Sequence, residues 1–283
     1  MAEAHTAHAV PKKGTPAPVV RFVGWGMLAI LAGYIINNFL NVGYGMPNVS
    51  DIISGQGGTL SSVTVGVYFI GLLIAFLYVQ RTKTTSLRYD AATIHKFNCY
   101  LIRALFFSVF FVGLADAGIA LMRVENMLSL FMSDDAARQF GRAAFVAPYV
   151  HIPLVALGFI VALFSRTLGF TWLALLIVAA ELLIVITRFV FSYEQAFMGD
   201  LVRYWYAALF LFASAYTLFD EGHVRVDILY AGFTQKTKGF VNAVGSLMLG
   251  SVTCWAILLV GMSGRQSMIN APVVSFEISQ SGS

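Results

Sequence analysis

Charge is what this sequence has least of. Only 11% of its 283 residues are charged, whereas a soluble domain carries about 25%. So few charged side chains cannot cover a water-facing surface, and the apolar excess, 58% of all residues, must therefore face lipid. This composition excludes a soluble fold. It indicates an all-α polytopic membrane protein, because a helix satisfies its own backbone groups within a bilayer.

Cysteine and catalytic motifs are also scarce. Cys99 and Cys254 lie in apolar runs and form no CxxC pair, so neither a disulfide framework nor a metal site is indicated. HExxH, GxSxG and GxxxxGK[ST] are absent, which argues against an enzyme and against ATP-driven transport by this chain alone. His95 lies at the predicted cytoplasmic end of the third apolar run, and His151 lies at the predicted outer end of the fourth. Two histidines on opposite sides of the membrane disfavour a bis-histidine haem. We expect no cofactor.

Seven runs have the length and apolar character that a membrane span of about 20 residues needs. They are residues 21–41, 60–80, 97–122, 146–165, 168–191, 201–219 and 239–262. Residues 1–20 are polar and predicted to be a disordered tail, and residues 42–59 are predicted to be a loop. The charged residues and clustered apolar residues of 123–145 predict an amphipathic helix on the membrane surface. The predicted fold is a bundle of about seven spans plus this helix.

The basic residues set the orientation, because Lys and Arg favour cytoplasmic loops. They lie between apolar runs and form no polar basic domain, so no nucleic-acid partner is expected. With the N-terminus in the cytoplasm, eleven basic residues are cytoplasmic: Lys12, Lys13, Arg21, Arg81, Lys83, Arg88, Lys96, Arg166, Arg225, Lys236 and Lys238. Six basic residues are then outside: Arg123, Arg138, Arg142, Arg188, Arg203 and Arg265. We therefore expect a cytoplasmic N-terminus.

The densest group of polar side chains is the stretch from Asp220 to Asp227, between the sixth and seventh runs. Its charged and histidine residues Glu221, His223, Arg225 and Asp227 predict a network at the membrane boundary. Arg225 has the geometry to bind a carboxylate or a lipid phosphate through two hydrogen bonds. A solvated loop is the alternative interpretation.

A second group consists of charges inside predicted spans. Arg103 and Asp116 lie in the third run, and Glu181 and Arg188 lie in the fifth, two helical turns apart. Charges at this depth usually face protein. We favour pairing between helices or subunits, and an ion site is the alternative. Gly113, Gly118, Gly245 and Gly250 are candidate positions of close helix packing.

Several motifs from Glu181 to Met262 resemble the small membrane subunit of the tripartite ATP-independent periplasmic (TRAP) transporters. Residues 186–191, Ile-Thr-Arg-Phe-Val-Phe, are similar to the family's x-x-R-Y-V-F, and Asp200 stands where the family has Glu. Ala215-Tyr216-Thr217-Leu218 and the following 221–230 resemble A-Y-x-L … G-H-V-R-V-D-x-x-Y. Residues 276–279 are similar to a G-E-x-S stretch that precedes a last core helix, but the chain stops at Ser283.

The resemblance implies a core over residues 166–283, with its last helix either missing or truncated, and an N-terminal extension of about four spans over 21–165. It implies a multi-pass subunit of the bacterial inner membrane that braces a large transport subunit and contacts membrane lipids. It also implies a periplasmic binding protein that delivers an organic acid for sodium-driven symport. Arg188, Asp200, Glu221, His223, Arg225 and Asp227 are then interface or headgroup residues.

Two other functions stay open at this point. The 24 Phe, 12 Tyr and 4 Trp residues could line a haem or quinone site in an oxidoreductase subunit. A free-standing transporter could use Arg103, Asp116 and Glu181 as its ion or ligand site.

Overall fold

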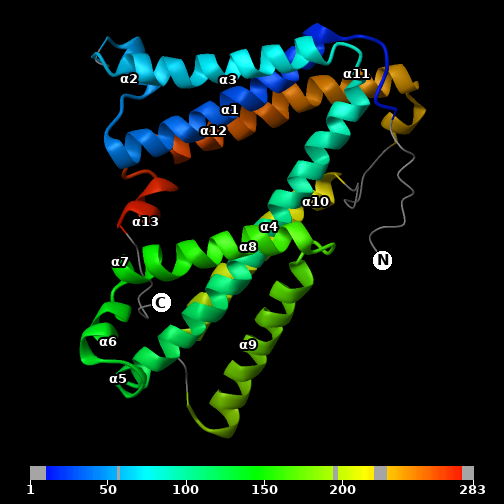
Figure 1. Cartoon of the computed structure of the whole chain (residues 1–283). Coiled ribbons are helices and arrows are strands. Elements are labelled where there is room, and N and C mark those ends of the chain that lie inside the picture. Colours follow the sequence, from blue (N-terminus) through cyan, green and yellow to red (C-terminus); the bar gives the residue numbers. More distant parts are fainter. Residues whose placement is uncertain (1–10, 56–57, 194–196, 220–227, 276–283) are drawn as a thin grey trace. The chain divides into compact units, whose positions relative to one another are not determined.

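The computed structural model describes residues 11–55, 58–193, 197–219 and 228–275, and every regular element in these ranges is helical (Figure 1). The prediction of an all-α fold is confirmed. Six helical segments have the length and apolar composition of a membrane span: Pro18–Tyr44, Ser61–Arg81, Leu87–Val124, Ala144–Phe164, Phe170–Val190 and Gln235–Gly261.

The sixth predicted run is the exception. It forms α10 (Met198–Phe219), a 22-residue helix that is not among the six candidate spans. Asp200 and Arg203, followed by Tyr204, Trp205 and Tyr206, make its first two turns too polar and aromatic. In the described part of the chain, six candidate spans therefore replace the predicted seven.

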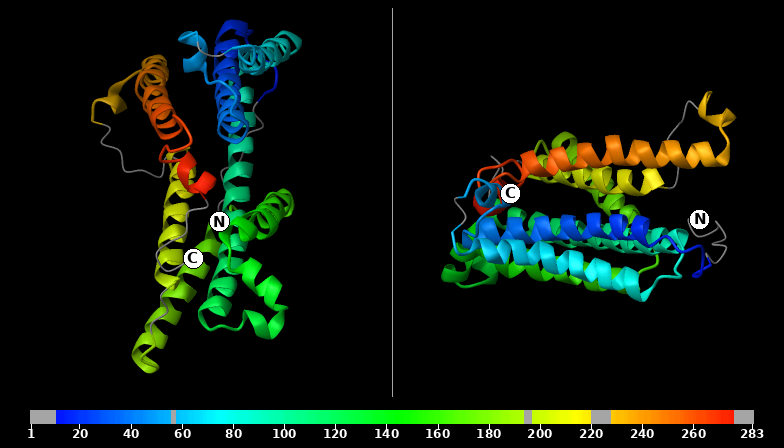
Figure 2. Two further views of the ribbon diagram at one scale, coloured as in Figure 1. Left: turned by 90° about the vertical axis from the view of Figure 1, so that its left-hand side faces the viewer. Right: turned by 90° about the horizontal axis from the view of Figure 1, so that it is seen from above.

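The chain forms two compact units, which we describe separately. The first contains the described residues of the ranges 11–95 and 233–275. Its centre is a hairpin of α1 (Pro18–Tyr44) and α3 (Ser61–Arg81), which lie side by side in all views (Figures 1 and 2). Gly33 allows close contact, because a Cβ there would lie 2.9 Å from the Tyr68 ring. The loop predicted at 42–59 contains a short helix, α2 (Val49–Ile53). A capping box of Asn48 and Asp51 stabilises the N-terminus of this helix.

The carboxyl-terminal part of the first unit is a long interrupted helix. It consists of α11 (Gln235–Gly245), a π-helical stretch η3 (Ser246–Ser251) and α12 (Val252–Gly261). Thr234 caps its start, since its hydroxyl accepts from the Thr237 amide. A short helix that the sequence did not predict, α13 (Asn270–Ser275), follows. Of the predicted tail, residues 1–10 lie outside the described residues. In the part that precedes α1, the Gly14 amide donates to the Thr84 carbonyl at 3.0 Å, and the Lys12 carbonyl accepts from the Ser86 amide at 2.9 Å.

The second unit contains the described residues of the range 96–232. Its main helices are the later part of α4 (Leu87–Val124), α8 (Ile152–Phe164), α9 (Phe170–Val190) and α10. The core joins α4, α9 and α10 through buried side chains, among them Phe106, Leu173, Ile177, Leu201 and Trp205. A smaller cluster of Ala104, Phe107 and Ala162 fixes α8 on α4.

The predicted surface helix over 123–145 is wrong as a single element. The stretch forms α5 (Leu128–Phe131), α6 (Asp134–Phe140) and the start of α7 (Ala143–Val146). Asn126 breaks it with a left-handed φ of 54°, and Ser133 starts a new helix by capping the Ala136 amide. A π-helical stretch, η1 (Ala147–His151), then leads into α8.

Candidate functional site

The signature residues of the polar stretch, Glu221, His223, Arg225 and Asp227, lie outside the described residues. The same holds for the stretch 276–279. Their predicted roles at an interface or lipid headgroup stay predictions. The described residues contain several other polar groups. One of them, around Arg21, was not predicted from the sequence.

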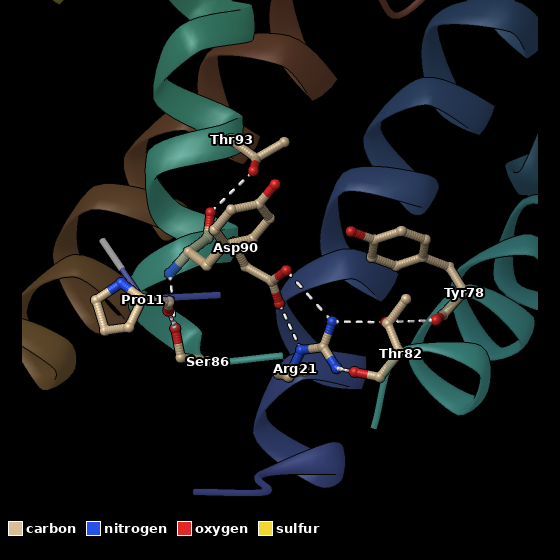
Figure 3. Close-up of polar contacts among 8 residues, drawn as sticks. Pro11, Arg21, Tyr78, Thr82, Ser86, Asp90 and Thr93 are labelled. Atoms are coloured by element: carbon tan, nitrogen blue, oxygen red, sulfur yellow. Dashed lines mark hydrogen bonds and ion pairs between the residues drawn. The ribbon is translucent and has the colours of Figure 1, made fainter. Parts of the chain in front are cut away.

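Arg21 is the centre of that group. Its side chain is fully buried in the first turn of α1 and pairs with Asp90, which is itself only 5% exposed (Figure 3). Nε donates to Oδ2 at 2.6 Å, and Nη2 donates to Oδ1 at 3.3 Å, so the carboxylate is bound through both oxygens. Two charged side chains that are taken out of water require such geometry and further hydrogen bonds.

The C-terminal end of α3 supplies those further bonds. Arg21 donates to the Thr82 backbone carbonyl and, from Nη2, to the Thr82 hydroxyl at 2.9 Å. That hydroxyl donates in turn to the Tyr78 carbonyl at 2.6 Å (Figure 3). The guanidinium thereby joins α1, the end of α3 and the start of α4. This arrangement is a structural clamp, because no side of Arg21 is open to a ligand.

The charges predicted within the third run have separate partners. Asp116 pairs with His151, with Oδ1 and Nε2 2.6 Å apart and both side chains about one-third exposed or less. Arg103 donates from Nη1 to the Ala162 carbonyl at 3.2 Å. Thirteen residues of helix separate the two by about 20 Å. The structure therefore does not bring Arg103 and Asp116 together, and each contacts a residue of another helical segment.

The charges of the fifth run lie on an exposed face of α9. Glu181 and Arg188 are both exposed in the chain taken alone. A cavity of about 310 Å³ beside Glu181 is bounded by Val178, Leu182, Val185 and Tyr206 of α9 and α10. A carboxylate such as that of Glu181 on an apolar, lipid-length helix favours a protein or polar neighbour.

Two polar contacts lie beyond the ends of the spans. Asp200, in the first turn of α10, pairs with Arg203 one turn later at 3.6 Å, and the Arg203 side chain is 84% exposed. The Tyr193 hydroxyl donates to the Glu125 carboxylate, and this hydrogen bond, followed by desolvation, raises the pKa of the Tyr193 phenol. The contact ties the loop after α9 to the end of α4.

Among the described residues, no three His, Cys, Asp or Glu side chains come together as metal ligands. His151, one of the histidines considered for haem, is engaged by Asp116. The sequence indicated Asp116 but not its partner, because the two lie 35 residues apart and the π-helical turn that places His151 has no strong sequence signal.

Comparison with known families adds the deciding observation. Residues 173–275 match the family described as tripartite ATP-independent periplasmic transporters, DctQ component. This part of the chain belongs to the DctQ family. The resemblance inferred from 181–262 is thereby confirmed, and the DctQ component is a transport component and not an enzyme.

The DctQ match begins within α9 and ends at α13, so α1 to α8 lie outside it. The matched residues therefore belong to a TRAP-type small component, and six helical segments of the described chain have the length and composition of membrane spans. Comparisons with curated proteins and with solved structures give no match.

Proposed function

We propose that this chain is the small permease subunit of a TRAP-type secondary transporter. In this role it braces a large transport subunit in the bacterial inner membrane. A periplasmic binding protein delivers an organic acid, and a sodium gradient drives its symport. The DctQ match over residues 173–275 is the observation that supports this proposal.

The apolar surface of the matched region supports a large membrane partner. None of the residues in the most apolar window of Gln235–Gly261 is buried within the chain. Phe240, Leu249 and Val260 are 69–75% exposed. Lipid alone can cover such a helix, but the exposed Glu181 carboxylate on α9 favours a protein neighbour.

Co-expression of the chain with its large partner tests the proposal. We expect Arg225→Ala to weaken assembly or uptake without changing which acid is preferred, because the small subunit does not hold the substrate. A variant that assembles normally and shows an altered preference would contradict this role. A conservative Arg225→Lys variant should retain part of the assembly, since the charge remains and the two-bond geometry is lost.

The alternative of a free-standing transporter has less support. Its proposed site required Arg103, Asp116 and Glu181 to act together, whereas Asp116 contacts His151, Arg103 contacts the Ala162 carbonyl and Glu181 is exposed. Substrate uptake by the purified chain alone in proteoliposomes would support the free-standing transporter. For the oxidoreductase alternative, a Soret band in the absorption spectrum of the purified chain would be the supporting result.

A further inference from the structure

A cavity of about 740 Å³ lies within the first unit, where α12 faces the hairpin of α1 and α3. Its volume falls in the range of sites that bind small ligands. The lining changes along the helices. Asn37, Asn38, Asn48, Ser50 and Ser263 supply polar groups on the side of the cavity nearer the helix ends, together with the apolar Val49, Leu259 and Met262, whereas Ile30 and Leu72 lie near the middle of α1 and α3. The polar groups of the lining therefore gather toward one end of the cavity, and the other end is apolar.

Asn37 points to a ligand at the polar end. Its side chain lies in a membrane-spanning helix and is only 2% exposed. Its Nδ2 donates to Asn48 Oδ1 at 3.4 Å, but its Oδ1 has no hydrogen-bond partner within the described part of the chain. A buried acceptor without a hydrogen bond destabilises the folded chain. A ligand hydroxyl in the cavity would donate the missing bond.

Charge narrows the class of ligand. The lining residues include amides, hydroxyls, aromatic rings and aliphatic side chains, and none of them is Lys, Arg, Asp or Glu. A carboxylate or a phosphate that leaves water without a cationic partner carries a large desolvation cost. The cavity is therefore suited neither to an organic acid nor to an anionic headgroup.

Contacts within the protein hold the cavity walls in place. The Tyr34 hydroxyl donates to the Leu258 carbonyl at 3.1 Å, and its ring lies edge-on to Trp255 at 5.6 Å. Asn38 and Asn270 exchange two amide hydrogen bonds of 3.0 Å. These bonds join α1 to α12 and α13, so the cavity is built before a ligand enters.

We propose that this cavity binds an uncharged lipid whose headgroup carries hydroxyl groups. The headgroup lies against Asn37 at the polar end, and the acyl chain lies along Ile30 and Leu72 toward the middle of the membrane. The wall formed by α12 belongs to the DctQ match, and the walls formed by α1 and α3 lie outside it. The bound lipid would fill the space between these two parts of the chain, whichever transport role the protein has.

Native mass spectrometry of the full-length chain in detergent tests the proposal with three lipid probes. Monoolein has two hydroxyls, methyl oleate has none, and dioleoylphosphatidylglycerol adds a charged phosphate. We expect monoolein to bind about tenfold more tightly than methyl oleate, the effect of about one good hydrogen bond. Asn37→Leu should remove that difference. Tighter binding of the phosphatidylglycerol than of monoolein would overturn the assignment to uncharged lipids.

Adjacent positions on α3 supply a matched pair of variants. Leu72 lines the cavity, whereas Leu73 does not and is 41% exposed. Leu72→Trp should fill the cavity and weaken monoolein binding about tenfold or more. Leu73→Trp introduces the same side chain without affecting binding. Equal monoolein binding by the wild type and both variants would overturn the proposal, even if Asn37→Leu fails to fold.

Discussion

At the scale of single residues, the buried pair of Arg21 and Asp90 should be the most sensitive to substitution. Asp90→Asn removes the carboxylate and leaves the guanidinium buried without its counter-charge. We expect the free energy of unfolding to fall by about 3–5 kcal/mol, measured by denaturation of the purified chain in detergent. Asp135→Asn is the control, because Asp135 and Arg138 form an exposed pair whose loss should change stability by about 0.5 kcal/mol. Equal effects would contradict the clamp.

The contact of Asp116 with His151 is expected to be a coupled pair. A double-mutant cycle with Asp116→Asn, His151→Gln and the double variant should give a coupling energy of at least about 0.5 kcal/mol. The two side chains are 2.6 Å apart in a partly buried setting. Additive effects on the melting transition would mean that the two residues do not interact in the folded chain.

Single residues also show what a sequence can and cannot predict. An unusual charge inside an apolar run is visible in the sequence, so Arg103, Asp116 and Glu181 were identified. Their partners were not, because the contacts join residues far apart in the sequence. Arg21 was counted among the cytoplasmic basic residues, and nothing near it indicated that Asp90, 69 positions later, would meet it.

At the scale of helices, the candidate glycines differ in their contacts. A Cβ at Gly113 of α4 would lie 2.5 Å from Nε1 of Trp205 on α10, whereas a Cβ at Gly118 would meet nothing within 4 Å. Trp205 is only 3% exposed and has little room to move. Gly113→Ala should therefore destabilise the chain by about 1–3 kcal/mol.

Gly118→Ala, five positions along the same helix, is the matched control. It should be neutral or slightly stabilising, because alanine favours a helix over glycine by about 1 kcal/mol. Thermal unfolding of the two variants in one detergent measures both effects. A destabilisation by Gly118→Ala that equals that of Gly113→Ala would contradict the packing of α4 on α10.

The six candidate spans were predictable because each is a long apolar run with charges near its ends. The elements whose existence or bounds the sequence did not predict are short or interrupted: α2, α5, α6, α7, α13 and the π-helical stretches η1 and η3. Their positions depend on caps such as Ser133 and on tertiary contacts such as that of Asn270 with Asn38. Of the glycine pairs, only Gly113 has a close neighbour, since Gly245 and Gly250, like Gly118, have nothing within 4 Å.

At the scale of the whole molecule, the distribution of Lys and Arg predicts a cytoplasmic N-terminus. Single cysteines at the exposed positions Lys83 and Arg138 test it, in a background with Cys99→Ala and Cys254→Ala. In intact cells, a membrane-impermeant maleimide should label Arg138→Cys and should label Lys83→Cys only after permeabilisation. The reverse pattern would contradict the orientation.

The central claim is that the chain is one subunit of a transporter that contains a larger membrane partner. Affinity purification of the tagged chain from its native membrane in mild detergent, followed by mass spectrometry, tests this claim most directly. The account predicts a large polytopic protein in stoichiometric amount. A chain that purifies alone, stable and monodisperse, would contradict it.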